Sequence, residues 1–319
     1  MKIELCKYKN DAKGAFSFTF DDGCYRESST EVIENFKRVY EEYGVKIKAT
    51  VGITVGFMHE WIIKFWQDAV SAGYFEIGSH SVGHDLSYLE STPYEVREKD
   101  ARLSKEQLKE MFPGQTVETY ILPGGTYDQK GLEVLRDYYL AVRCNRDGIN
   151  YPGKINWLDI KCLTAMLKKP FSYYTDYIDE VIKTGGWGVQ MNHWITHKEE
   201  DTFHSQKAES FHDECSYIGE KVKNGELWAS SFEDVAKYIR KYEQSDLNVI
   251  EIDGKLKAEI IPNSDTPEAI LNTPLTISIE TENDILLYGK DGGTTRLTPD
   301  KNGKILVETV NSIEFEPVL

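Results

Sequence analysis

Two pairs of side chains in the first third of the chain have types and spacings suited to metal-dependent hydrolysis. The first pair is Asp21 and Asp22, adjacent carboxylates in the segment Thr-Phe-Asp-Asp-Gly at residues 19–23. Neighbouring residues in an extended or turning backbone point in different directions, so one carboxylate can ligate a metal while the other faces a bound water. Taken alone, Asp-Asp-Gly is more often simply a turn.

The second pair is His80 and His84, in the segment His-Ser-Val-Gly-His. Two imidazoles four residues apart on one helical turn share a face and can bind a single ion. Histidines at this spacing are also common on helix surfaces. Without further context the pair therefore favours a metal site only weakly.

The elements that would position these residues alternate between short β-type runs and longer amphipathic patterns. Strands are predicted at 15–20, 46–53, 74–79, 117–122, 140–144, 159–163, 187–192 and 227–229, and helices at 28–43, 59–72, from 93, from 128, 172–184, 206–223 and 231–243. Such alternation predicts a parallel sheet, and seven or eight units favour a closed (β/α) barrel over an open sheet. We therefore expect an α/β fold.

In a barrel of this kind, the residues directly after the strand C-termini meet at one face, where catalysis takes place. Asp21, Asp22, His80, Pro123 and His193 each follow a predicted strand. Their positions predict that these five residues converge on one site.

The composition changes near residue 247. All seven His, five Cys, six Trp and five Met lie before it, and half of the ten Pro lie after it. The tail alternates short β-type runs with turns and has no helical period, a pattern typical of a small all-β sandwich of about seven strands. The sequence therefore predicts a barrel domain over residues 1–247 and a small β-sandwich domain over 248–319. Without His, Cys or Trp, the tail is a poor candidate for catalysis.

Charge and cysteine usage exclude several classes of function. The net charge of −16 and the pI of about 5.0 argue against nucleic acid or an anionic membrane as partner. The five scattered cysteines form no CxxC pair, which argues against a zinc knuckle. The chain shows no signal-type apolar segment and no stretch near the ~20 apolar residues of a membrane span. As given it is expected to be cytoplasmic without membrane insertion, or secreted or periplasmic if a leader was removed.

Four motifs follow one another along the chain: an Asp pair after a predicted strand, a His-x-x-x-His after a predicted strand, a Pro-Gly-Gly turn and a strand that ends in His. Over roughly residues 14–243 the chain thereby resembles the polysaccharide deacetylase family, the chitooligosaccharide-deacetylase-like carbohydrate esterases with a distorted (β/α) barrel. The resemblance implies that Asp22, His80 and His84 bind one divalent ion and that Asp21 is the catalytic base. Zinc is the default ion for two imidazoles and a carboxylate. The implied partner is an acetylated oligo- or polysaccharide.

Two motifs depart from the family pattern. Many members have Arg-x-Pro-x-Gly, in which the Arg orients the base, whereas this chain has Ile121 ahead of Pro123, Gly124 and Gly125. Arg143 or Arg146, both near the end of another predicted strand, could substitute. The fourth motif, usually Asp-Trp, is reduced to Asn-Trp, which leaves Trp157 either as a groove wall or as a core residue.

The expected mechanism assigns one task to each group. Asp21 accepts the proton of the attacking water. The metal and a backbone N–H near Tyr25 or in the Gly124-Gly125 turn stabilise the oxyanion. The residues expected to contact substrate are Pro123, Gly124, Gly125, Trp157 and Tyr25. His193 protonates the leaving amine or alkoxide. His193 is preferred over the nearby His197 and His204 because the apolar run ends at His193.

We expect an active deacetylase acting on N- or O-acetyl groups, and two alternatives remain. A metal-independent hydrolase of cyclic amides on a related barrel conflicts with the intact set Asp22, His80 and His84. A catalytically impaired carbohydrate-binding protein on the same fold draws its support from Ile121, which replaces the motif Arg.

Overall fold

The computed structural model describes residues 1–198, 205–289 and 292–318. Its contacts divide the chain into two compact units. One comprises Lys13–Ala236, and the other combines Met1–Ala12 with Lys237–Leu319. Within the described ranges, no helix has the length and apolarity needed to cross a bilayer.

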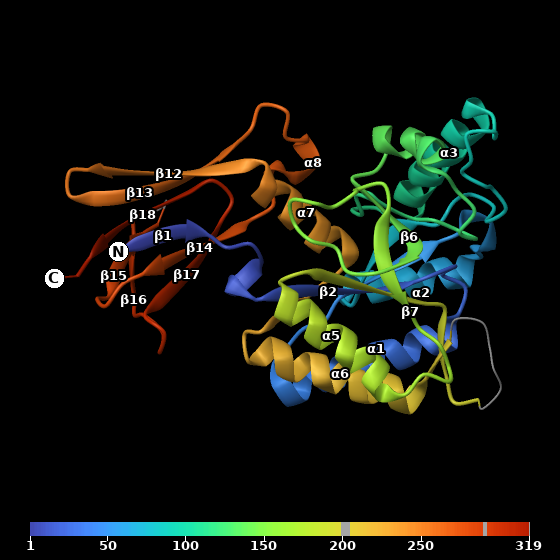
Figure 1. The fold of residues 1–319 in the computed structure, drawn as a ribbon, viewed down its shortest axis with the longest axis horizontal. Coiled ribbons are helices and arrows are strands. Elements are labelled where there is room, and N and C mark those ends of the chain that lie inside the picture. Colours follow the sequence, from blue (N-terminus) through green and yellow to red (C-terminus); the bar gives the residue numbers. More distant parts are fainter. Residues whose placement is uncertain (199–204, 290–291, 319) are drawn as a thin grey trace. The chain divides into compact units, whose positions relative to one another are not determined.

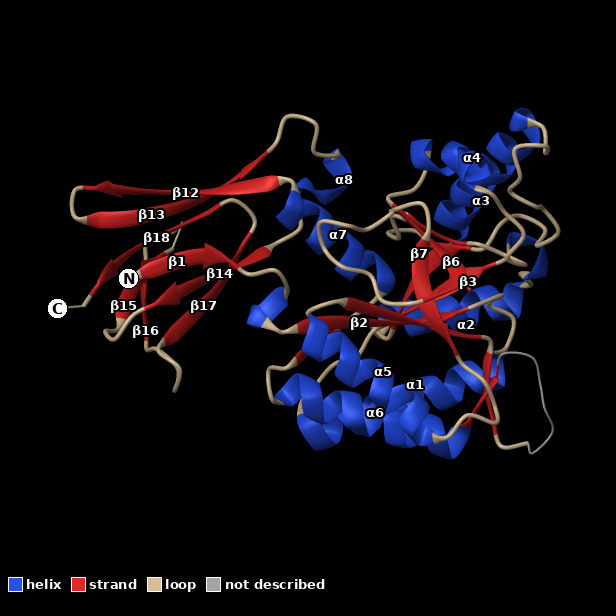
Figure 2. Cartoon of the chain, in the orientation of Figure 1, coloured by secondary structure: helices blue, strands red, loops and turns tan. Residues whose placement is uncertain are grey.

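The larger unit is the expected α/β barrel (Figure 2). Its strands are β2 (Gly14–Phe20), β3 (Ala49–Ile53), β4 (Phe75–Ser79), β5 (Thr119–Ile121), β6 (Ala141–Asp147), β7 (Ile160–Thr164), β8 (Trp187–Asn192) and β11 (Leu227–Ala229). They pair in parallel in sequence order from β2 to β8, and β8 pairs with β2 to close the ring. The prediction of a (β/α) barrel is thus confirmed.

The barrel is distorted at β2. The first residues of this strand pair with β11 and its last two residues pair with β3. Strand β11 therefore inserts beside β2 only at the N-terminal end of the barrel. The opposite end, where the strands finish, is formed by the ring β2 to β8 alone.

The helices of the barrel unit are α1 (Arg26–Tyr43), α2 (Glu60–Ser71), α3 (Tyr94–Met111), α4 (Gln129–Leu132), α5 (Phe171–Thr184), α6 (Ala208–Lys223) and the start of α7 (Phe232–Glu243), with short 3-10 turns at Val55–Phe57 and Glu133–Asp137. A further 3-10 turn, Lys9–Asp11, belongs to the smaller unit. Helix α1 buries Val32, Phe36 and Val39 at helical spacing. It ends at Gly44, whose φ of 71° is the left-handed conformation that glycine adopts without strain. Helices α1, α5 and α6 lie side by side along one flank (Figure 1).

The alternation of β2 explains how a carboxylate comes to point into the barrel. Phe16, Phe18 and Phe20 form one face of the strand, and Phe18 and Phe20 pack against Phe211 of α6. The intervening residues point the other way, into the barrel, because strand side chains alternate. Thr19 there donates to the Gln190 carbonyl of the neighbouring strand β8 at 2.9 Å. Asp21 continues this inward set directly after the strand ends.

The smaller unit consists of two antiparallel sheets and one short helix, α8 (Glu268–Leu271). One sheet has the order β1 (Lys2–Leu5), β14 (Leu275–Glu280), β17 (Lys304–Thr309). The other has the order β12 (Ser245–Ile252), β13 (Lys255–Pro262), β18 (Ser312–Pro317), β15 (Ile285–Tyr288), β16 (Thr294–Leu297). The core of this unit is apolar, with Ile277, Ile279 and Phe315 fully buried. The all-β character predicted for the tail is confirmed.

This unit also contains residues that the sequence assigned to the barrel domain. Strand β1 pairs with β14, bringing Lys2 opposite Glu280 and Leu5 opposite Ile277. Lys241 in α7 donates to three carbonyl groups of this unit, those of Leu271, Thr273 and Val310. The contacts therefore group residues 1–12 and 237–247 with the sheets. Separate folding of residues 248–319 stays a prediction.

Candidate active site

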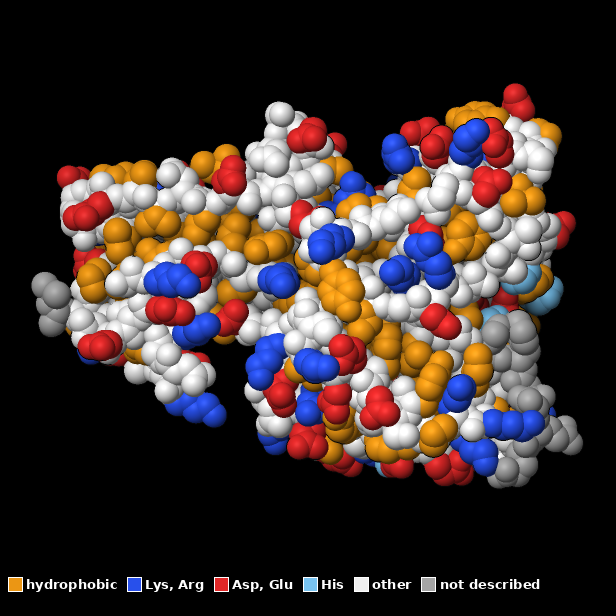
Figure 3. Space-filling model, viewed as in Figure 1, with side chains coloured by type: hydrophobic (Ala, Val, Ile, Leu, Met, Phe, Trp, Pro, Cys, Tyr) orange, Lys and Arg blue, Asp and Glu red, His pale blue; other side chains and the backbone are white. Residues whose placement is uncertain are grey.

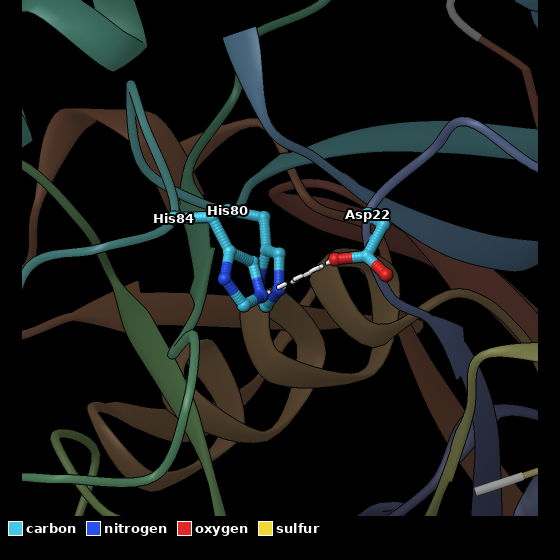
Figure 4. Close-up of side chains that lie close together, drawn as sticks. All are labelled: Asp22, His80 and His84. Atoms are coloured by element: carbon cyan, nitrogen blue, oxygen red, sulfur yellow. Dashed lines mark ion pairs between the residues drawn. The ribbon is translucent and has the colours of Figure 1, made fainter. Parts of the chain in front are cut away.

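The structure brings Asp22, His80 and His84 together at the C-terminal end of the barrel strands. Both imidazole Nε2 atoms face the Asp22 Oδ1 atom, at 3.5 Å from His80 and 3.3 Å from His84. Figure 4 shows the two rings directed at the carboxylate from the same side. One ligand atom from each residue lies within 4.8 Å of the other two. This spacing suits a single ion bound between them.

The loop that carries the two histidines is not helical. Ser81 and His84 have φ values of 70° and 68°, and Asp22 has a φ of 71°. The expectation of two imidazoles on one helical turn is therefore wrong, because the backbone turns through left-handed residues between them. Such non-glycine residues cost on the order of 1–3 kcal/mol each and concentrate at functional sites. Here all three belong to the two motifs.

His80 tests whether a cation fits this position. Its Nδ1 atom lies 2.6 Å from the Ile121 carbonyl oxygen. Because a carbonyl only accepts, Nδ1 carries a proton, and in the neutral imidazole the buried Nε2 atom then presents a lone pair. Among the residues that the structure describes, this Nε2 atom has no hydrogen-bond partner. A lone pair directed at a carboxylate is unfavourable unless a cation lies between them, so the donor set fits a metal ion.

Asp100 of α3 anchors the histidine loop. Its Oδ1 atom accepts from the Val82 N–H at 2.9 Å, and its Oδ2 atom accepts from the hydroxyls of Tyr88 and Tyr120 at 2.8 and 3.0 Å. The loop is closed by the His84 N–H, which donates to the Ser81 hydroxyl at 2.8 Å. Sequence reasoning missed Asp100, since an acidic residue in a highly charged helix gives no signal of its own.

The second carboxylate, Asp21, is paired with Arg143. The Arg143 Nη2 group donates to Asp21 Oδ1, and the two residues are only 1 % and 4 % exposed. The Asp21 N–H donates to the Asn192 carbonyl at 2.8 Å, which fixes the backbone to the end of β8. Burial raises the pKa of Asp21, but the guanidinium and the nearby histidines outweigh it and hold this pKa below its ordinary value.

Arg143 supplies the positive charge beside Asp21 that Ile121, at the motif Arg position, cannot supply. Ile121 of β5 and Arg143 of β6 are direct register partners on neighbouring strands. The cation has thus moved one strand along the barrel while still reaching Asp21. The other option from the sequence, Arg146, instead pairs with Asp159 at 2.8 Å.

His193 directly follows β8 and lines the same cavity as His80 and His84. Burial lowers the pKa of His193 below its ordinary value, although the carboxylates of Asp21 and Asp22 oppose this effect. His197 is 69 % exposed at its side chain and faces Glu31 at 3.5 Å. His204 lies outside the described residues.

These groups enclose a small cavity of about 90 Å³. Its walls are formed by Asp21, His80, His84, Leu122, Gly124, Gly125, Arg143, Asn145, Met191 and His193. Gly125 has a φ of 70°, and an added Cβ would displace the Asn145 side chain, so both the backbone and the space favour glycine here.

The remaining residues proposed from the sequence lie farther out. Pro123 is buried beneath the Gly124-Gly125 turn. Tyr25 stands beside Trp194, with ring centroids 4.5 Å apart. Trp157 packs against the buried Trp187 at 6.5 Å and is not among the residues that line the cavity. Trp157 is half-buried, so its assignment as a groove wall or a core residue stays open.

Comparison with known proteins places residues 8–142 in a family model described as polysaccharide deacetylase. Similar solved structures include a family 4 acetyl xylan esterase from Clostridium thermocellum in complex with a cobalt ion, with 13 % identity, 69 % of this chain and 89 % of that chain covered, and a TM-score of 0.46. A peptidoglycan deacetylase from Bacillus subtilis has 12 % identity, coverage of 73 % and 94 %, and a TM-score of 0.42.

A 4-alpha-glucanotransferase from Thermococcus litoralis is similar over 70 % of this chain and 40 % of that chain, with 12 % identity and a TM-score of 0.45. No curated protein sequence matches the chain. The family match therefore rests on residues 8–142, which contain both the Asp pair and the histidine pair.

Proposed function

We propose that the chain is a member of the polysaccharide deacetylase family, whose model matches residues 8–142, and that it hydrolyses acetyl groups from an acetylated oligo- or polysaccharide in a metal-dependent reaction. The observation that carries this proposal is the shared cavity. Both histidines of the Asp22, His80 and His84 cluster, the buried Asp21 carboxylate with its arginine, and a third histidine border the same small space.

Asp22, His80 and His84 would hold one divalent ion, and zinc is the ion most often bound by two imidazoles and a carboxylate. When bound, such an ion supplies Lewis-acid polarisation of an acetyl carbonyl and favours the ionisation of water. The His80 Nδ1–H bond to the Ile121 carbonyl fixes the tautomer that leaves Nε2 free to ligate.

Asp21 acts as the general base in this proposal. Arg143 holds the Asp21 carboxylate ionised and oriented, so it can accept the proton of a water that attacks the acetyl carbon. The developing oxyanion is stabilised by backbone N–H groups near Tyr25 or in the Gly124-Gly125 turn. His193, which also lines the cavity, donates a proton to the leaving amine or alkoxide.

The rival interpretation as a carbohydrate-binding protein without catalysis rested on Ile121. Because Arg143 supplies Asp21 with the cation that Ile121 cannot, this rival loses its main support. A metal-independent hydrolase would leave the buried His80 Nε2 lone pair facing the Asp22 carboxylate with no cation between them. On the face shown in Figure 3, basic side chains are interspersed with acidic ones, as on a surface without a polyanion partner.

The experiment is acetate release from a panel of N-acetylated and O-acetylated glycans, with and without a chelator. We expect release from at least one glycan, loss of release with the chelator, and recovery on adding zinc. Release that persists in chelator would support the metal-independent rival. Glycan binding without release from any member of the panel would support the binding protein.

A further inference from the structure

The two motifs that supply the metal ligands follow strands separated by one other strand of the barrel. Asp22 comes after β2 and His80 comes directly after β4, and strand β3 pairs with both of these strands. The chain that leaves β3 therefore runs between the two motifs. It consists of Thr54 and the 3-10 turn Val55–Phe57, together called the segment 54–57.

Thr54 bonds to both motifs. Its N–H donates to the Asp22 carbonyl at 3.2 Å, and its hydroxyl donates to the His80 carbonyl, also at 3.2 Å. Thr54 is completely buried, so these bonds form away from water, where a hydrogen bond is stronger. Through Thr54, the backbones of two ligands from different strands are joined at a fixed separation.

The turn after Thr54 holds the histidine loop. The N–H groups of Val55 and Gly56 donate to the carbonyls of Ser81 and Val82 at 3.2 and 2.8 Å. Ser81 has the left-handed φ of 70°, and a strained residue of this kind persists only where its surroundings hold it. The turn therefore supports the backbone between the two histidines.

The ring of the third ligand, His84, stacks on Phe57. The ring centroids lie 6.0 Å apart and the ring planes differ by 22°. His84 is the more exposed histidine, with 33 % of its side chain exposed against 1 % for His80. The His80 ring is oriented by the Ile121 carbonyl, whereas contact with Phe57 limits the rotation of the His84 ring.

We propose that the segment 54–57 positions the three metal ligands, with Thr54 setting the separation of the two motifs and Phe57 orienting His84. The inference rests on the metal site of the proposed function and adds to it residues outside both motifs. Ligands that are held in place before an ion arrives lose less conformational freedom when it binds. The segment therefore raises the affinity of the site for a divalent ion.

The first test measures Co²⁺ binding to the metal-free full chain, together with the visible absorption of the bound ion, which reports ligand geometry. Thr54→Val keeps the shape of the side chain but removes the hydroxyl donor. Co²⁺ affinity should fall roughly 10- to 100-fold, the usual loss when a group that supports a metal ligand is removed. The absorption spectrum should change as well. Thr54→Ser keeps the hydroxyl and should restore both affinity and spectrum.

Thr50 gives the matched control. It lies on β3, is also completely buried, and donates its hydroxyl to Glu76 at the other end of the barrel. Thr50→Val should lower stability in urea unfolding but leave Co²⁺ affinity and spectrum unchanged. An unchanged affinity in Thr54→Val, or an equal loss in Thr50→Val, would overturn the role of Thr54.

Phe57 tests the same inference at a position where the fold tolerates change, since it is 37 % exposed. Phe57→Leu should weaken Co²⁺ binding roughly two- to tenfold, the size expected for one lost ring contact, and Phe57→Tyr should recover it. Phe171→Leu, at a phenylalanine of α5 with 39 % exposure, should leave the affinity unchanged. Equal affinity in Phe57→Leu and the wild type would overturn the role of the ring.

Metal binding and acetate release separate this inference from the proposed function. Co²⁺ affinity that depends on Thr54 and Phe57, without acetate release from any glycan, would uphold the inference and refute the proposed function. Acetate release by a chain whose Co²⁺ affinity is the same in the wild type, Thr54→Val and Phe57→Leu would refute the inference and uphold the function.

Discussion

The two ends of the barrel interior each hold a buried carboxyl group, yet their surroundings favour the ionised form of one and the neutral form of the other. Asp21, at the end where the strands finish, is 4 % exposed and faces Arg143. Glu76, near the beginning of β4, is 5 % exposed and accepts from the Thr50 hydroxyl at 2.6 Å and from the Glu233 N–H at 2.7 Å. Both belong to the inward-facing residues of their strands.

Both carboxylates are buried, so the direction in which each pKa shifts depends on the charged groups beside it. Burial raises the pKa of Glu76 to about 8, and the Glu233 carboxylate reinforces this shift more than Lys48, at 3.5 Å, opposes it. At Asp21 the arginine reverses the effect of burial, and the pKa falls. One end of the barrel thus holds a charged base beside a cavity, and the other holds a largely neutral group that binds the start of α7.

The largest difference between the two carboxylates is expected when each is replaced by its amide in turn. Asp21→Asn should lower kcat by roughly 10²–10⁴, the usual cost of losing a general base. Glu76→Gln keeps the shape of the neutral acid, so its kcat should stay within about twofold of the wild type on general-acid–base grounds. Acetate-release kinetics on one glycan measure both. Similar losses in the two variants would mean that Asp21 acts through the fold rather than as the base.

His193 should show a loss that depends on the leaving group. An amine cannot leave unprotonated, so His193→Ala should slow amide hydrolysis by roughly 10²-fold or more and hydrolysis of an activated ester much less. The exposed His197 offers the matched control, and His197→Ala should leave both rates unchanged. Equal losses on amide and ester would remove the assigned role of His193 as the acid.

Arg143→Met should have a smaller effect on rate together with a diagnostic change in pH profile. Without the guanidinium the pKa of Asp21 rises, so the acidic limb of kcat/KM should move to higher pH. Stability should also fall by roughly 3–5 kcal/mol, because Asp21 loses its buried partner. Arg146→Met, which removes the arginine that pairs with Asp159, should leave the limb in place. An unmoved limb in Arg143→Met would show that this arginine does not tune the base.

Sequence reasoning located the strand-terminal residues of the site but not their supports. Asp21, Asp22 and His80 could be placed because each follows an alternating strand, and a barrel brings strand ends together. The choice between Arg143 and Arg146 depended on which side chain faces inward across a closed ring, which only the pairing of β5 with β6 decides. Strand β1 was missed because its partner β14 lies about 270 residues away along the chain.

The smallest expected effect is the pH dependence of stability at the other end of the barrel. Because the folded-state pKa of Glu76 lies near 8, above its ordinary 4.5, the folded chain keeps a proton that the unfolded chain releases. Stability should therefore fall as pH rises between these values, by at most about 1.4 kcal/mol per pH unit. Glu76→Gln should flatten this slope in urea unfolding, leaving the contribution of Glu214, whose pKa burial also raises to about 8. An unchanged slope would contradict the neutral state of Glu76.

The central claim is that Asp22, His80 and His84 hold one catalytic ion while Asp21 holds none. It is tested most directly by measuring divalent metal per chain together with acetate release in four proteins. The wild type, Asp21→Asn and His212→Ala, which changes an exposed histidine of α6, should each bind about one ion. His80→Ala should lose metal and activity together by roughly tenfold or more. Full metal occupancy in His80→Ala, or loss of the ion in Asp21→Asn, would contradict this assignment.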